Sequence, residues 1–176
     1  YGLGNKPQID VSADATSAYG ISLNNINYVS INNIAIKGSG GAGAFSARGA
    51  TGTGGSGFTV LVTGVDVLSN YGASGGGDCF SLADTAQVEF HTIAATGCRA
   101  NPADGSSDQS ITTHTDSYAK VYGATFSDSE YWAVNTLNSK IELHDITATT
   151  ALVAGFTLGL DATSNGWIKV YDSTIT

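Results

Sequence analysis

The chain has 176 residues, of which 12% are charged, and its formal net charge at pH 7 is −8. A negative charge repels phosphate groups, so it argues against a nucleic-acid partner and against binding to an anionic membrane surface. No apolar run reaches the length that spans a bilayer, and the chain contains no Met. We therefore expect a segment of a larger or processed protein.

A repeated pattern begins at residue 19. We interpret residues 1–18, which precede it, as an entry or cap segment. The first copy of the pattern reads GISLNNINYVSINNIAIKG and runs from Gly20 to Gly38. Later copies start at Ala44, Cys79, Ser110, Ala133 and Gly155. The copy at Ala44 is interrupted by the glycine-rich stretch TGTGGSG. Repeats of this length indicate stacked units, each too small to bury a core alone.

Each copy opens with a short stretch in which apolar and polar residues alternate. Alternation with a period of two is typical of a strand that has one buried face. The first apolar position is occupied, copy by copy, by Ile21, Phe45, Phe80, Ile111, Val134 and Phe156. We expect these side chains to form a single internal file.

A second alternating stretch follows, then a single bend residue and a third short stretch. The bend residues are Asn33, Gly64, Thr92, Gly123, Asp145 and Asp172. Gly, Asn and Asp tolerate positive φ, so most of these residues suit a sharp corner. A βαβ fold would need a helical connection of about ten or more residues, and none is visible. The pattern predicts an all-β fold, a right-handed parallel β-helix (a solenoid) of about six coils with three short strands each, over residues 19–176.

The outward positions of the second stretch check this register independently. One outward column reads Ser30, Leu61, Glu89, Lys120, Glu142 and Lys169. Its last four members alternate in sign, as expected if adjacent coils lie about 4.8 Å apart and like charges repel. The next outward column reads Asn32, Thr63, His91, Tyr122, His144 and Tyr171. We interpret its regular alternation of aromatic rings as structural, and the two histidines lack the further ligands that a metal site needs.

The two cysteines belong to the same copy of the repeat. Cys79 opens the first stretch, and Cys98 lies just past the third, where the chain returns towards the same corner. A disulfide is geometrically plausible there and would fix the base of the long loop that follows. Two buried free thiols are the open alternative.

Two residues depart from the small polar side chains on the outer face of the first stretch. Arg48 and His114 lie two coils apart, so their backbones should be about 10 Å from each other. The neighbouring loops contribute Asp78, Arg99, Asp104 and Asp108. The predicted catalytic group is Asp108, His114, Asp78 and Arg48, with Arg99 and Asp104 binding substrate.

Two kinds of chemistry fit this group. A pair of carboxyl groups at a defined separation serves glycoside hydrolysis. In lyase chemistry a base removes a proton next to a carboxylate, and a cation stabilises the developing charge. The ordinary alternative is that Asp104 belongs to a turn and that Asp108 caps its loop.

The segment SDSEYW, residues 127–132, is a separate candidate for sugar binding. Tyr131 and Trp132 at a coil corner would offer flat faces to a sugar, with Glu130 beside them. The alternative is that Trp132 folds over the edge of the sheet and packs there.

The three-stretch coil with its short polar corner, seen in INNIAI, FHTIAA and LHDITA, resembles the pectate-lyase-like superfamily of right-handed β-helices over nearly the whole chain. That superfamily includes polysaccharide lyases, glycoside hydrolases and phage tailspikes or tail fibres. The Asn-Thr-Asp, Asp-Asp and Gly-His-Gly motifs of polygalacturonases are absent. Of the calcium-binding acids and the Arg or Lys base of pectate lyases, Asp78, Asp108 and Arg48 are loose counterparts. We therefore expect no cofactor, and calcium is the one alternative that the resemblance allows.

The glycine-rich, weakly charged chain is most similar in character to a phage tailspike or tail fibre. The resemblance implies a homotrimer, outside the cell or on the virion surface, that binds bacterial polysaccharide with or without cleaving it. Two other functions remain open: a secreted polysaccharide lyase or glycoside hydrolase, and a non-catalytic structural solenoid or adhesin stalk. The shared architecture does not decide among them.

Overall fold

The structure is a computed structural model. It describes residues 6–11, 19–38, 43–49, 60–68, 78–98, 109–128, 132–149, 154–159 and 166–176. Every helix or strand assigned in these ranges is a β-strand, and every strand pairing is parallel. The predicted all-β class is therefore confirmed. No helix in the described ranges is long and apolar enough to cross a membrane.

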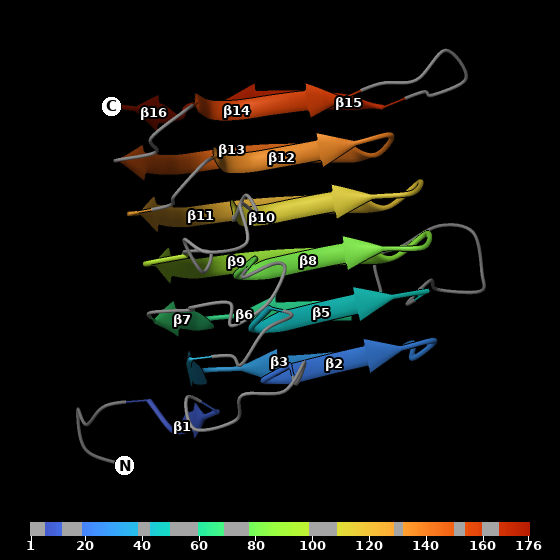
Figure 1. The fold of residues 1–176 in the computed structure, drawn as a ribbon, viewed down its shortest axis with the longest axis vertical. Helices are drawn as coiled ribbons and strands as arrows, with labels where there is room; N and C mark the ends of the chain where they lie inside the picture. Colours follow the sequence, from blue (N-terminus) through green and yellow to red (C-terminus); the bar gives the residue numbers. More distant parts are fainter. Residues whose placement is uncertain are drawn as a thin grey trace, which may run out of the picture.

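The first stretches of the six copies form one six-stranded sheet, seen at the front of Figure 1 with all its arrows pointing the same way. Its strands are β2 (Ile21–Asn24), β5 (Phe45–Arg48), β8 (Phe80–Ala83), β10 (Gln109–His114), β12 (Trp132–Leu137) and β14 (Ala154–Gly159). Each strand pairs with the strand of the next copy in the register read from the sequence, for example Phe80 with Ile111 and Val134 with Phe156. We call the strands contributed by one copy a layer.

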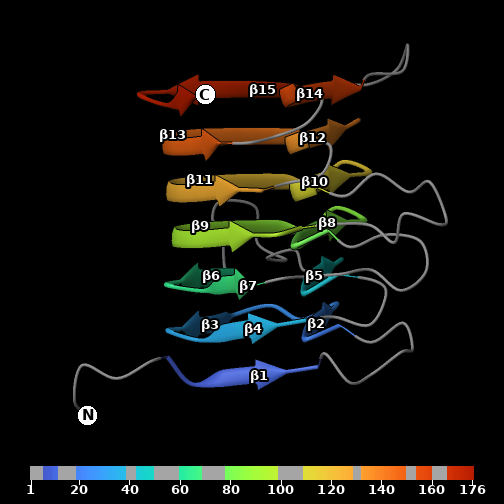
Figure 2. The same cartoon turned by 60° about the vertical axis from the view of Figure 1, so that its left-hand side comes forward.

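The second and third stretches form a ten-stranded sheet. Figure 2 shows its longer strands beside those of the six-stranded sheet, layer by layer. Its members are β1 (Gln8–Asp10), β3 (Val29–Asn32), β4 (Ala35–Lys37), β6 (Val60–Thr63), β7 (Asp66–Leu68), β9 (Gln87–Thr96), β11 (Tyr118–Ser127), β13 (Lys140–Thr149), β15 (Trp167–Tyr171) and β16 (Thr174–Ile175).

Two features of this sheet differ from the expected arrangement. In three layers the second and third stretches run together as one strand, because pairing with the next layer continues on both sides of the bend residue. Strand β1 lies within residues 1–18 and pairs in parallel with β4, so this segment extends the sheet by one strand. The Lys6 ammonium lies 2.7 Å from a carboxylate oxygen of Asp66 and ties the segment to β7.

The inward side chains of both sheets form one apolar core. The predicted internal file is fully buried at Phe45, Phe80, Ile111 and Val134. The rings of Phe45, Phe80 and Phe90 pack with centroids 5.4 to 6.0 Å apart, so the two sheets are in direct contact through aromatic side chains. Burying each such ring contributes about 1.5–3 kcal/mol.

All six predicted bend residues have positive φ. The angles are 54° at Asn33, 62° at Gly64, 52° at Thr92, 67° at Gly123, 56° at Asp145 and 47° at Asp172. Thr92 is the unfavourable member of the column, because a β-branched residue is strained in this conformation. The corner is thus imposed by the stacking of layers and is not an effect of local preference alone.

The bend column gives a stability test with opposite signs at two positions. Thr92→Gly should raise the free energy of unfolding by about 0.5–1 kcal/mol, because glycine adopts positive φ without strain. Gly123→Val should lower it by about 1–2 kcal/mol through φ alone, since a Cβ at Gly123 would meet no heavy atom within 4 Å. Urea unfolding measures both changes. Thr147→Gly, at a regular position of β13, is the matched control and should lower the free energy of unfolding. If Thr92→Gly lowered it too, Thr92 would not be strained by its positive φ.

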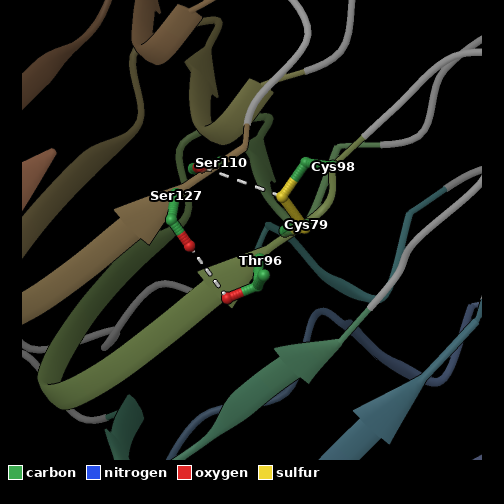
Figure 3. The surroundings of a disulfide bond; sticks show 5 residues. All are labelled: Cys79, Thr96, Cys98, Ser110 and Ser127. Carbon is green, nitrogen blue, oxygen red and sulfur yellow. Dashed lines mark hydrogen bonds between the residues drawn. A yellow bond between two sulfur atoms is a disulfide. The ribbon is translucent and has the colours of Figure 1, made fainter. Parts of the chain in front are cut away.

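The two cysteines form a disulfide, so the alternative of free thiols is wrong. Their Cα atoms lie 5.7 Å apart, and both residues are fully buried. The bond joins Cys79, just before β8, to Cys98, two residues beyond β9, and closes one layer into a covalent ring (Figure 3). The Cys98 Sγ also lies 3.7 Å from the Ser110 hydroxyl at the start of the next layer.

Removing this ring should destabilise the protein mainly by freeing the unfolded chain. The cysteines are 19 residues apart, and closing a loop of that length contributes about 3 kcal/mol. The double variant Cys79→Ala/Cys98→Ala should therefore lose about 2–4 kcal/mol in urea unfolding, with a larger m-value because the unfolded chain expands. A loss below about 1 kcal/mol would mean that the ring adds little to the stacked layers.

Candidate functional site

The outward side chains of the six-stranded sheet differ in exposure from layer to layer. Nearer the starts of the strands, the outward side chains of Ser46 and Thr112 are buried. The sequence had predicted that they would be exposed on the outer face of the sheet. The final residues are more open: the Arg48 side chain is 55% exposed, and His114 is half-buried. Arg48 and His114 are therefore two accessible side chains at the ends of their strands.

Arg48 and His114 lie two layers apart, as predicted. Arg48 pairs with Ala83 of the next layer, and the residue before His114 pairs with Leu82. Ala83 thus lies between the two longer side chains, whose backbones are separated by two strand spacings, or about 10 Å. The small side chain of Ala83 is itself buried. We call the group of Arg48, Ala83 and His114 the Arg48–His114 notch.

The environment of His114 favours a neutral imidazole. Its Nε2 lies 2.8 Å from the hydroxyl of Thr112, on the same strand. Burial lowers the pKa of His114 from its ordinary value, and the positive charge of Arg48 lowers this pKa further. A neutral imidazole held by one hydrogen bond can accept a proton, as a general base must.

Two carboxylates in the turns after these strands were not among the predicted site residues. Asp84 follows β8, and its carboxylate lies 3.8 Å from the Arg48 guanidinium. Asp116 follows β10, and its backbone N–H donates to the Asn138 carbonyl of the next layer at 2.9 Å. Both aspartates have positive φ and are exposed. The sequence did contain a signal for them, since the same register that aligns Arg48 and His114 places these turns directly after the notch.

The structure does not bring Asp78 to the notch. Asp78 precedes β8, where its carbonyl accepts the N–H of Ala44, whereas Arg48 is paired with the last residue of β8. Five residues of extended chain separate Asp78 from Ala83, a distance of about 16 Å. Arg99, Asp104, Asp108, Glu130 and Tyr131 lie outside the described residues. Trp132 begins β12, where it pairs with Gln109 and Ala154 through the backbone.

The outer face of the ten-stranded sheet carries the two predicted columns. The rings of His91, Tyr122, His144 and Tyr171 are stacked nearly parallel, with centroids 5.0, 4.8 and 4.4 Å apart. Rings stacked on one another cover each other's faces and leave mainly their edges to solvent. This column therefore offers little flat surface to a sugar, which agrees with its interpretation as structural.

The charged column is neutralised within itself. The Glu142 carboxylate lies 3.8 Å from the Lys120 ammonium of the layer before and 3.7 Å from that of Lys169 in the layer after. It also accepts a hydrogen bond of 3.0 Å from the Tyr118 hydroxyl, and burial together with this carboxylate raises the Tyr118 pKa. Among the described residues, no group of three or more His, Cys, Asp or Glu could hold a metal ion. Asp78 is the one predicted calcium-binding acid within these ranges.

A scan against protein-family models and searches of curated proteins and solved structures found no match to this chain.

The notch makes a prediction about proton binding. Arg48→Gln should raise the His114 pKa but leave it below 6.5, because burial, the larger cause, remains. Titration of the His114 imidazole by NMR measures this shift. The unfolded chain binds this proton more tightly than the folded chain does. The free energy of unfolding should therefore decrease as pH falls from 6.5 to the folded-state pKa of His114. His114→Gln should remove that component; a wild-type pKa at or above 6.5 would contradict the assignment.

Proposed function

We propose that the layers are coils of a right-handed parallel β-helix of the pectate-lyase-like superfamily, and that the chain is the carbohydrate-facing domain of a phage tailspike or tail fibre. Three observations support this fold: parallel pairing between equivalent residues of successive layers, a positive-φ corner in each layer, and one continuous core. The bound ligand is a polysaccharide of the bacterial surface.

The Arg48–His114 notch is the observation that carries this function. Guanidinium, imidazole and carboxylate groups meet there beside a small residue, and such groups pair with the hydroxyl and carboxylate groups of sugars. The strand ends of successive layers form a line along which a chain of sugar rings can lie. Asn24 and Leu137 continue the column on either side, and both are exposed.

A catalytic version of this function is favoured by the state of His114. In a lyase the neutral imidazole would remove the proton next to the carboxylate of a uronic acid, while Arg48 stabilises the negative charge that develops. The electron pair left behind forms a C=C bond, the glycosidic C–O bond breaks, and the departing oxygen takes up a proton from the imidazolium or from water. This is the reaction of the second candidate, a secreted polysaccharide lyase.

The oligomer and the location follow from the same proposal. Phage tailspikes bind their receptors as homotrimers, so we propose a trimer outside the cell or on the virion surface. The buried Cys79–Cys98 disulfide supports an oxidising compartment, because such bonds persist mainly outside the cytosol.

Affinity electrophoresis through gels that contain bacterial surface polysaccharides tests the proposal. The wild-type chain should be retarded by at least one polysaccharide, and Arg48→Ala or His114→Ala should reduce the retardation at least fivefold. Lys37→Ala and His91→Ala remove the same kinds of side chain from the other sheet, so they are the matched controls and should bind normally. Sedimentation of the same samples reports whether the chain is a trimer.

The outcomes separate the three functions. Binding without release of oligosaccharides supports a receptor-binding domain. Release of products that absorb through a new C=C bond, lost in His114→Ala, supports the lyase. A chain that binds none of the polysaccharides would overturn the proposal and leave the structural solenoid.

A further inference from the structure

The hydroxyl of Thr112 is the hydrogen-bond partner of the His114 ring at the notch. Thr112 lies two residues before His114 on β10, so both side chains are on the outward face of the strand. The hydroxyl oxygen of Thr112 lies 2.8 Å from Nε2 of His114. Thr112 is fully buried, whereas His114 is half-buried. Nε2 is therefore held against a buried group, and Nδ1 is the ring nitrogen that remains for a ligand.

The Thr112 hydroxyl has no second hydrogen-bond partner in the part of the chain that the structure describes. Its neighbours in the outward column are Ser81 of the layer before and Asn135 of the layer after. Among the described residues, neither of them is hydrogen-bonded to Thr112, and the His114 ring is. A hydroxyl group has one proton to donate, and leaving that proton without an acceptor in a buried place costs free energy. The Thr112 hydroxyl is therefore best satisfied when it donates to Nε2.

This donation fixes where the imidazole carries its own proton. His114 is neutral at pH 7, because burial and the charge of Arg48 lower its pKa. A neutral imidazole has one N–H group and one nitrogen with a lone pair. If Nε2 accepts the proton of Thr112, the N–H group is at Nδ1. Free histidine prefers its proton at Nε2, so the Nδ1–H form requires a specific partner such as this hydroxyl.

We propose that Thr112 is a positioning residue that fixes His114 in the Nδ1–H form, so that the notch offers two N–H donor groups, one from Arg48 and one from His114, to oxygen atoms of the ligand. This inference rests on the proposed polysaccharide function and narrows it. The neutral charge of His114 permits the lyase reaction, but the tautomer opposes it, because the lone pair that would remove the proton faces Thr112. The notch therefore binds carboxylate or hydroxyl oxygens of the sugars without cleaving the chain.

NMR of the full chain with isotope-labelled histidine tests the tautomer without any ligand. At about pH 8, where the imidazole is neutral, the ring resonances of His114 should show a protonated Nδ1 and an unprotonated Nε2. Thr112→Val keeps the shape of the side chain and removes the hydroxyl, so the ratio of the Nδ1–H form to the Nε2–H form should fall about threefold or more. Thr112→Ser keeps the hydroxyl and should keep the tautomer.

Thr113→Val is the matched control for this test. Thr113 is the next residue of β10 and is also fully buried, and its hydroxyl donates to that of Thr136 at 3.2 Å. Thr113→Val should lower the free energy of unfolding in urea but leave the His114 tautomer unchanged. An equal change of tautomer in Thr113→Val and Thr112→Val would reflect a general loosening of β10 and would overturn the positioning role.

Affinity electrophoresis then connects the tautomer to the ligand. Thr112→Val should reduce the retardation by a bound polysaccharide about three- to tenfold, as expected for one hydrogen bond. Thr112→Ser should bind normally, and the wild-type chain should release no oligosaccharide. If Thr112→Val does not fold, the tautomer of the wild-type chain and the binding of Thr112→Ser still decide the question.

Three results would overturn the proposal: a wild-type His114 that carries its proton at Nε2, the same tautomer in the wild-type chain and in Thr112→Val, or oligosaccharide release that depends on His114. The first two are measured without a polysaccharide, so they are distinct from a failure of the proposed function. A chain that shows the Nδ1–H form but binds no polysaccharide would overturn the proposed function and the ligand assignment, while it supports the positioning role of Thr112.

Discussion

Parallel pairing between equivalent residues of successive layers is the constraint on which the rest of the structure depends. A single layer buries almost nothing, because its inward side chains are covered only by the layers above and below. Once pairing is in register, each apolar position lies over its counterpart, and the file from Phe45 to Val134 becomes fully buried. A slip of one residue would turn every inward side chain outward, so the core enforces the register.

The same register explains why opposite charges alternate in one outward column, and histidine and tyrosine rings in the other. Residues that lie about 4.8 Å apart in adjacent layers must be compatible, whether they are charges or rings. Glu142 between Lys120 and Lys169 satisfies this condition for charge, and Tyr122 between His91 and His144 satisfies it for aromatic stacking. Each column stabilises its own layer stack and leaves few unsatisfied groups for an external ligand.

Periodicity carried enough information to predict the strands, their register and the bends, because each depends on a short pattern repeated six times. It could not predict that the outward Ser46 and Thr112 are buried, since covering them does not alter the alternation. It also grouped Asp78 with Arg48 because the loop that Asp78 ends borders the same sheet, although Asp78 lies at the start of β8 and Arg48 is paired with its last residue. The disulfide stayed open for a different reason: Cys79 and Cys98 suit either a bond or an apolar core.

Function is therefore best sought where the repeat is broken. On the six-stranded sheet the break is the substitution of small polar residues by Arg48 and His114 around Ala83. In this column the neighbouring layers do not supply matching charges or rings on both sides of Arg48 and His114. Part of their charge and hydrogen-bonding capacity is therefore directed outward. On the ten-stranded sheet the outward columns are regular from β9 to β15. A ligand at the notch would supply the complement that the neighbouring layer supplies elsewhere.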